Sequence, residues 1–248
     1  MKRLNLRQRN LIINGAPESS LNQLSNKLGL SKTTVYYWYK KSGKGKKMVK
    51  VSINETDQEK TGEFIGAFAG DGNYTKDGNY RHQISISLNS KDVEYILHLS
   101  ELIKFIFGKE PWRYTRTEYH VTIIRIVSKD ALNFIAKYLY WSDNKTRTVQ
   151  LSKHVSPSTK FGIGFLRGLM DTDGYLGKNQ KIAVFSTISE GLASNITDYL
   201  TKFDIQYKLY IQKDKRPNIK PVFRIRVTRD FTKFIHLIRP YHSNLFAY

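Results

Sequence analysis

The sequence predicts an α+β protein in which an αββαββα unit occurs twice, related by a pseudo-twofold axis, behind a small all-helical module. Two short stretches indicate the repeat: residues 64–72 read FIGAFAGDG and residues 166–174 read LRGLMDTDG. Each begins as an apolar helical run and ends in Asp-Gly, and a similar order of strand and helix patterns follows both. A shared order at a spacing of about 100 residues indicates an internal duplication.

The composition divides the chain into five segments. Residues 1–50 hold 12 Lys or Arg and a single acid, Glu18, so much of the basic excess lies at the N-terminus. The Lys- and Gly-rich run at 40–47 is typical of a flexible linker. We expect a helix-turn-helix-like module at 1–42, a basic linker at 43–60, a first half at 61–140, an inter-half linker at 141–158 and a second half at 159–248.

The formal net charge of +20 over 248 residues favours a polyanionic partner, because neutralised phosphates release counterions. The absence of cysteine excludes disulfides, thiol nucleophiles and cysteine-based metal sites. No run is long and apolar enough for a membrane span, and no signal-peptide core follows the basic N-terminus. We therefore expect an intracellular protein of a prokaryote or an organelle, without a membrane partner.

The N-terminal module is predicted from two helical stretches and the turn between them. Leu21, Leu24 and Leu28 recur at helical spacing, and Gly29 supplies a turn. Ser31 is placed to cap a second helix, as in helix-turn-helix units, where the start of the second helix faces base edges. The predicted DNA contacts of this module are Ser31, Lys32, Thr33, Tyr36 and Tyr37; an ordinary helical hairpin is the alternative.

The elements after residue 61 follow from apolar periodicity. The first motif helix leads to a hairpin at an Asp-Gly turn, with Ile84, Ile86 and Leu88 alternating with polar residues. A helix near 90–107, strands at 112–117 and 119–127 and a helix at 129–140 complete the first half. The second half is predicted as a motif helix at 159–173, strands at 175–188, a helix at 189–203, a second strand pair and a helix at 230–238.

The two motif helices are predicted to pack closely and to place two acidic residues together. Gly66 and Gly70, like Gly168 and Thr172, are four residues apart and share a helical face, so two helices can pack closely. Asp71 and Asp173 then emerge at the same end of the pair. Two such acids at a pseudo-twofold axis suit a Mg²⁺ site, with Mn²⁺ as an alternative ion.

Polar residues of the predicted strands face away from the apolar ones. These Gln, Lys, Arg, Ser and Thr side chains suit hydrogen bonds to base edges and phosphates in a major groove, although a solvated sheet face is the alternative. The predicted contacts are Lys76, Arg81, Gln83, Ser85, Ser87 and Arg113 in the first half, and Lys178, Lys181, Gln206, Lys208, Tyr210, Gln212, Arg224, Arg226 and Thr228 in the second.

The paired motifs resemble the LAGLIDADG homing endonuclease family in its single-chain, two-motif form, over residues 60 to 240. The second motif is close to the family pattern, and the first is looser, with Ala69 in place of a further Asp. The resemblance implies that Asp71 and Asp173 are the catalytic acids and that the backbone carbonyls of Gly70 and Thr172 add metal ligands. It also implies a basic residue near the scissile phosphate, for which Lys145 is the candidate; the second half offers no matching lysine.

The expected function is therefore that of a monomeric, site-specific double-strand DNA endonuclease. By resemblance, its biology is the mobility of its own intron or gene. Two other functions remain open at this point. The chain is alternatively a non-cleaving DNA-binding regulator or RNA-splicing maturase on the same scaffold, or a basic RNA-structural protein.

Overall fold

The computed structural model describes residues 4–15, 21–41, 51–77, 81–153, 158–177, 179–213 and 220–241. The chain divides into two compact units, Met1–Lys50 (unit 1) and Val51–Tyr248 (unit 2). Among the helices in these ranges, none combines the length and apolar character that crossing a membrane needs.

Unit 1 is a three-helix module of α1 (Leu6–Gly15), α2 (Leu21–Leu28) and α3 (Lys32–Lys41). Its small core consists of Leu4, Ile12, Leu24 and Val35. Gly29 adopts the left-handed conformation (φ 60°) between α2 and α3, and the Ser31 side chain accepts a hydrogen bond from the Thr34 N–H at 3.2 Å. The turn and the N-cap therefore lie where the sequence predicts them.

Helix α1 was not predicted. Its sequence has no clear apolar stripe, and Ile12 is its one fully buried side chain among those described. A capping box does mark its start: Asn5 Oδ1 accepts from the Gln8 N–H at 2.8 Å, and Gln8 Oε1 accepts from the Asn5 N–H at 3.2 Å. Asn5 and Gln8 thus mark the start of α1, which the spacing of apolar residues does not predict.

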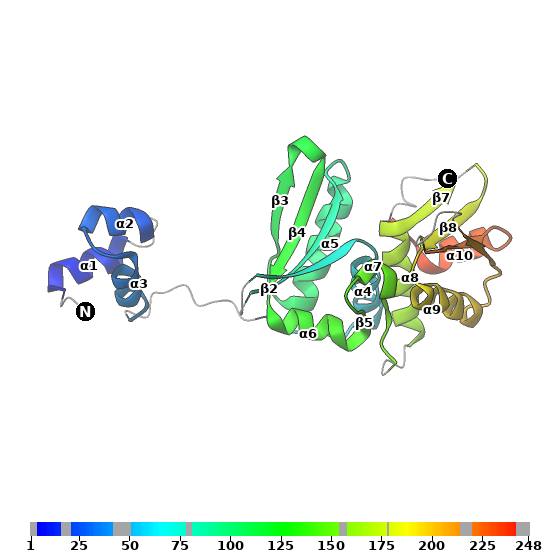
Figure 1. Cartoon of the computed structure of the whole chain (residues 1–248), viewed down its shortest axis with the longest axis horizontal. Helices are drawn as coiled ribbons and strands as arrows, with labels where there is room; N and C mark the ends of the chain where they lie inside the picture. Colours follow the sequence, from blue (N-terminus) through cyan, green and yellow to red (C-terminus); the bar gives the residue numbers. More distant parts are fainter. Residues whose placement is uncertain are drawn as a thin grey trace. The chain divides into compact units, whose positions relative to one another are not determined.

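Unit 2 contains two similar halves (Figure 1). The first half comprises helices α4 (Gln58–Asp71), α5 (Val93–Phe107) and α6 (Lys129–Tyr138), the 3₁₀ turn Thr117–Tyr119, and strands β1 (Gly72–Asp77), β2 (Arg81–Asn89), β3 (Trp112–Arg116) and β4 (Val121–Val127). The second comprises helices α8 (Thr159–Asp173), α9 (Glu190–Lys202) and α10 (Phe231–Ile238), and strands β7 (Gly174–Gly177), β8 (Ile182–Thr187), β9 (Lys208–Gln212) and β10 (Val222–Val227).

Each half has a four-stranded antiparallel sheet with the same strand order, β1-β2-β4-β3 and β7-β8-β10-β9. Figure 1 shows α4 and α8 between the two sheets, and one continuous apolar core spans both halves. The predicted α+β class and the duplicated αββαββα order are confirmed.

Two predicted segments need correction. Residues 51–57, expected in the basic linker, belong to unit 2: the N–H groups of Ser52 and Asn54 donate to the carbonyls of Phe107 and Ile106 at the end of α5. The expected inter-half linker at 141–158 contains helix α7 (Lys145–Thr148) and strand β6 (Gln150–Leu151). Strand β6 pairs with β5 (Leu139–Tyr140), which replaces the predicted end of the helix at 129–140. Both segments look polar in sequence and are ordered by contacts with the core.

Candidate catalytic centre and nucleic-acid interface

Helices α4 and α8 make the most extensive contact between any two elements in the described part of unit 2. A Cβ added to Gly66 would lie 2.2 Å from the Phe165 carbonyl oxygen, and one added to Gly168 would lie 2.1 Å from that of Glu63. The backbones therefore touch where these glycines lie, as the four-residue spacing predicts. Gly62 and Gly164 extend the same stripe by one turn, with added-Cβ distances of 2.1 and 1.9 Å to backbone oxygens.

The contacts follow the pseudo-twofold axis. Gly62 faces the Phe161 carbonyl, and Gly164, 102 positions after Gly62, faces the Glu59 carbonyl, 102 positions before Phe161. Asp71 and Asp173 are separated by the same number of positions. Both helices begin at a capped end, at Asp57 and Ser158, and run side by side to these acids.

The two carboxylates meet where the helices end. A Cβ on Gly70 would lie 2.3 Å from Thr172 Oγ1 and 3.3 Å from Asp173 Cγ, so Asp173 stands against the end of α4. Burial raises the pKa of Asp71 to about 6, and the charge of Asp173 adds to the rise. Burial behind the helix ends also raises the pKa of Asp173, although one side of this residue is open to solvent. Close acids with raised pKa values are a feature of functional sites.

Lys145 reaches this centre from α7. Its Nζ donates to the carbonyl oxygens of Phe68, Ala69 and Gly70 at 2.9, 2.7 and 2.8 Å, which satisfies backbone acceptors at the end of α4. Burial lowers the pKa of Lys145 to about 8, and the attraction of the two aspartates opposes the fall. An ammonium group at this point partly balances the acids and is positioned to interact with a phosphate.

The donor set fits a divalent ion of the Mg²⁺ type. Mg²⁺ prefers oxygen ligands, binds through one or two carboxylates and keeps water or substrate oxygens in its shell. Asp71 and Asp173 supply the carboxylates, and the described residues contain no group of three or more His, Cys, Asp or Glu side chains suited to a metal. Gly70, predicted as a further ligand, has its carbonyl oxygen engaged by Lys145.

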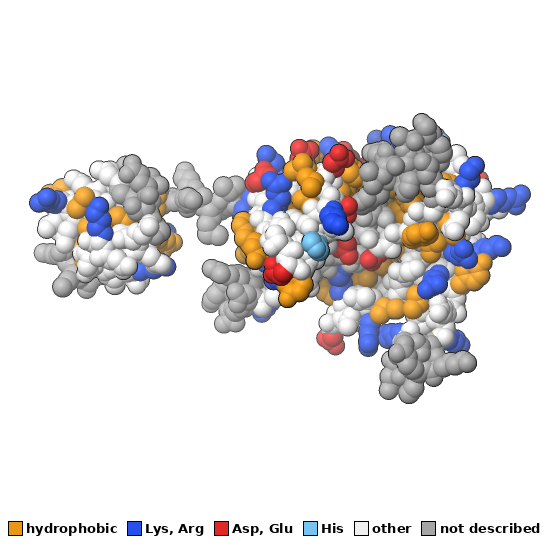
Figure 2. Space-filling view, turned by 90° about the horizontal axis from the view of Figure 1, so that it is seen from above, with side chains coloured by type: hydrophobic (Ala, Val, Ile, Leu, Met, Phe, Trp, Pro, Cys, Tyr) orange, Lys and Arg blue, Asp and Glu red, His pale blue; other side chains and the backbone are white. Residues whose placement is uncertain are grey.

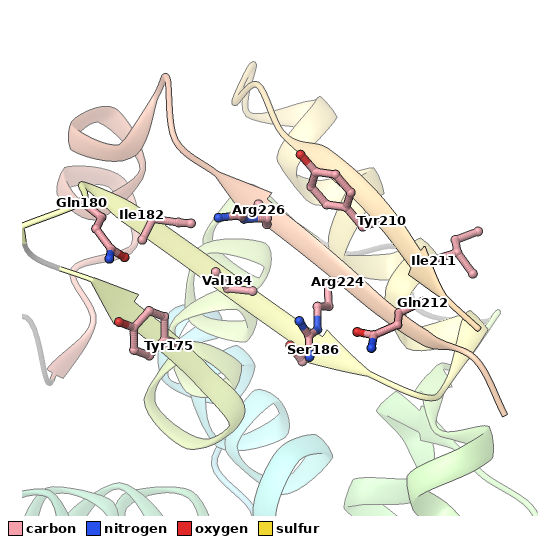
Figure 3. A pocket seen from close by; sticks show the side chains of 10 residues that line it. All are labelled: Tyr175, Gln180, Ile182, Val184, Ser186, Tyr210, Ile211, Gln212, Arg224 and Arg226. Carbon is pink, nitrogen blue, oxygen red and sulfur yellow. The ribbon is translucent and has the colours of Figure 1, made fainter. Parts of the chain in front are cut away.

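The outward face of the second sheet forms an open groove of about 670 Å³. Figure 3 shows side chains from all four strands lining it. The strand register places the predicted contacts Lys208, Tyr210, Gln212, Arg224 and Arg226 on this face, opposite the buried face of β10. Further lining residues that the sequence reading did not select are Tyr175, Gln180, Ile182, Val184, Ser186 and Ile211.

The outward face of the first sheet contains some predicted contacts but not all. Gln83 and Ser87 lie on it, while Ser85 is only 8% exposed. Lys76 pairs with His82 and Arg113 pairs with Ile124, so by strand alternation both belong to the opposite face. The prediction of Lys76 and Arg113 as DNA contacts did not take this alternation into account.

Aromatic residues were overlooked on the same outward face. Trp112 and Tyr114 stack with ring centroids 5.5 Å apart, and the Arg125 guanidinium lies 4.9 Å from the Trp112 ring centroid. These residues are suited to packing against nucleotides, because aromatic rings and guanidinium planes stack on bases.

The remaining predicted contacts lie at the sheet margins. Gln206 precedes β9 and is tied by its N–H to Asp230 and by Oε1 to Arg229. Lys181 is exposed in the turn between β7 and β8, and Thr228 is exposed just after β10. Lys178 lies outside the described residues, as does the side chain of Arg81.

In unit 1, Lys32, Thr33, Tyr36, Tyr37 and Lys40 are exposed and share one face of α3, whereas Val35 is buried. On the face drawn in Figure 2, Lys and Arg side chains project from the outer side of the second half. Asp and Glu gather over the first half and toward the middle of unit 2.

A duplicated αββαββα fold with two glycine-packed helices that end in paired acids is the arrangement of the LAGLIDADG fold. The comparison with family models agrees, because residues 160–239 match the family described as a LAGLIDADG-like domain. Residues 160–239 therefore form a LAGLIDADG-like domain, and unit 2 as a whole has the LAGLIDADG fold.

Individual proteins with this fold include the homing endonuclease I-DmoI. Its complex with DNA and Ca is 18% identical to this chain over 74% of the chain and 91% of I-DmoI, with a TM-score of 0.58. Full-length DUF199/WhiA from Thermatoga maritima is 14% identical over 77% of the chain and 59% of that protein, with a TM-score of 0.50. At these identities the similarity shows the fold.

A curated sequence relative is the replication factor C small subunit of Methanocaldococcus jannaschii. It is 28% identical over 169 residues, which cover 68% of this chain. The chain spans about 9% of the length of that relative.

Proposed function

We propose that this chain is a site-specific endonuclease that hydrolyses both strands of a DNA duplex with the help of a divalent metal ion. The observation that carries the proposal is the placement of Asp71 and Asp173 side by side at the joined ends of α4 and α8. Two sheets of one chain, with outward-facing polar, basic and aromatic residues, accompany this centre and supply a duplex-binding surface. I-DmoI, which has the same fold, is described in complex with DNA and Ca and with DNA and Mn.

Asp71 and Asp173 would hold the ion, and water and phosphate oxygens would complete its shell. When bound there, a divalent ion activates water and neutralises phosphate charge, as phosphodiester hydrolysis requires. Because burial raises the pKa of Asp71 to about 6, this carboxylate is ionised and able to hold a cation at and above neutral pH, whereas below pH 6 a proton would compete with the ion. Lys145 holds positive charge beside the same point and, with a pKa lowered to about 8, is suited to stabilising or protonating a leaving oxygen.

We further propose that Mg²⁺ is the working ion with Mn²⁺ as a substitute, that one chain suffices because it carries both motifs, and that unit 1 adds contacts to the same DNA. The exposed face of α3 and the basic excess of residues 1–50 support the last point. An intracellular location and a role in the mobility of its own intron or gene complete the proposal.

A non-cleaving DNA-binding regulator is the second candidate. Lys145 Nζ already satisfies the Gly70 carbonyl oxygen, which is the backbone ligand expected for the metal. A site neutralised in this way by its own lysine would bind DNA without cutting it.

Supercoiled plasmid libraries carrying random inserts, incubated with Mg²⁺, distinguish the two candidates. The endonuclease predicts linear product from a subset of inserts, lost in Asp173→Asn while binding of the same inserts persists. Binding without linear product from any insert, at every Mg²⁺ and Mn²⁺ concentration, supports the regulator. Preference for structured RNA over duplex DNA at matched salt would overturn both.

A further inference from the structure

The outward faces of the two sheets correspond position by position across the pseudo-twofold axis. Arg226 belongs to the row of paired residues that starts at Tyr175, and Arg125 belongs to the row that starts at Asn73. Because Tyr175 and Asn73 follow their catalytic-motif glycines directly, the two rows are equivalent. An arginine therefore occupies the same place in both halves.

Both of these arginines are held by an aromatic ring. The Arg125 guanidinium lies 4.9 Å from the centroid of Trp112, and its Nε is buried without a hydrogen-bond partner. The Arg226 guanidinium lies 5.6 Å from the centroid of Tyr210. Stacking restricts the conformations of each side chain, which reduces the entropy lost when it docks against a base.

The next outward position on the same strands differs. On β10 it is Arg224, which is exposed and makes no ion pair with any described residue. On β4 it is Ile123, a half-buried apolar side chain. Their neighbours are equivalent, since Tyr210 lies opposite Arg224 and Tyr114 lies opposite Ile123. At this position the paired serines Ser186 and Ser87 also match, so within this row of paired residues the difference lies in Arg224 and Ile123.

Base chemistry turns this difference into a sequence preference. Arginine pairs in bidentate fashion with O6 and N7 of guanine, whereas an apolar side chain contacts the methyl group of thymine. Outward neighbours on one strand are about 6.6 Å apart, at about 3.3 Å per residue. Successive bases of one DNA strand rise about 3.4 Å, so Arg224 and Arg226 reach bases about two steps apart.

This inference rests on the proposed DNA recognition. We propose that the DNA target of this chain carries matching guanines that Arg125 and Arg226 contact, and that it is asymmetric at the base that Arg224 contacts. Arg224 reads a further guanine about two base steps from that of Arg226. At the pseudo-symmetric position Ile123 contacts a thymine methyl. The target is therefore a partial palindrome, and Arg224 and Ile123 set one of its departures from symmetry.

Selection from a random duplex library by the full chain in EDTA, followed by sequencing of the bound DNA, tests the proposal. Arg224→Ala and Arg226→Ala are each expected to relax one guanine, the two positions lying about two steps apart, with a loss of about 5- to 150-fold in preference. Ile123→Arg is expected to replace a thymine preference by guanine in the other half-site. Lys208→Ala, on the same face, is the control and should weaken all sequences evenly, as a phosphate contact does.

The proposed base recognition is refuted if Arg224→Ala and Arg226→Ala weaken binding to all sequences evenly, as Lys208→Ala does. It is also refuted if the selected sequences lack the paired guanines. The melting temperature of each variant shows that it is folded, and Arg224→Ala remains a test when Ile123→Arg does not fold. Selected DNA that is bound as expected but never cut in Mg²⁺ refutes the endonuclease and leaves the readout standing. DNA that is cut without guanine preference refutes the readout alone.

Discussion

Replacing Gly168 with alanine tests the close approach of α4 and α8 directly. The new Cβ would lie 2.1 Å from the Glu63 carbonyl oxygen and 2.6 Å from the Ala67 nitrogen, both backbone atoms of α4. Ordinary carbon–oxygen contacts are about 3.3–3.6 Å, so the helices must move apart by about 1 Å. Forced overpacking of this kind costs about 1–3 kcal/mol or more, even though alanine favours the helix by up to about 1 kcal/mol.

A loss of about 3 kcal/mol corresponds to a fall of roughly 6–12 °C in melting temperature for a unit of this size. Calorimetry on the full chain measures it, with Gly191→Ala as the matched control. Gly191 is also helical, but the three atoms nearest to its added Cβ belong to the side chain of Gln150 and not to the backbone of a facing helix, so this substitution should leave the packing of α4 on α8 intact. Equal melting temperatures for Gly168→Ala and the wild type would refute the backbone-contact interpretation of the glycine stripe.

Four other substitutions probe the charges around this helix pair. Arg167→Met removes the guanidinium that donates to Glu63 at 3.0 Å and leaves that buried carboxylate short of a partner, so denaturant unfolding should show a loss of about 3–5 kcal/mol. Because the pKa of Asp71 is raised to about 6, its protonated form stabilises the fold at low pH, and this stabilisation is lost as pH rises through 6. Asp71→Asn should therefore raise the melting temperature of the metal-free protein at pH 7.5 by a few degrees. The same substitution should abolish stabilisation by added Ca²⁺. The hydrogen bond with the Glu63 carboxylate raises the pKa of His98. Protonated His98 therefore stabilises the fold fully below the pKa that it has in the unfolded chain, and this stabilisation is lost as pH rises through its pKa in the folded protein. In His98→Gln the urea midpoint should depend less on pH between 6 and 8 than in the wild type. Lys145→Met should reduce cleavage by about 100-fold or more with little loss of DNA binding, and an unchanged rate would exclude a role in chemistry.

The sequence predicted the helix pair well because its signal is local. Gly66, Gly70, Gly168 and Thr172 are regularly spaced, and the motif that contains them also fixes where the acids emerge. Lys145 was identified through the family resemblance alone. Nothing in its surrounding residues indicates that its ammonium would lie against the end of α4.

Register explains the mixed result for the sheets. In the second half the apolar residues of β10 alternate over the whole strand, so Arg224 and Arg226 were placed correctly on the outward face. In the first half Lys76 and Arg113 lie where the strands extend beyond the core and every side chain is exposed. Charge alone then suggests a DNA contact, and only the pairing partners show that these residues face the other way.

The charged network beneath the acids has no sequence signal, because its members come together only in the fold. Glu63 is 3% exposed and contacts both His98 and Arg167. The pseudo-symmetry equivalent of Glu63 in the second half is Phe165, so this network exists on one side of the axis only. If α4 packed against a copy of itself, the buried Glu63 would keep His98 but lose Arg167, so the network favours the pairing of α4 with α8. If Arg224 and Ile123 contact DNA as proposed, the difference between them would likewise give the protein one orientation on a partly symmetric site.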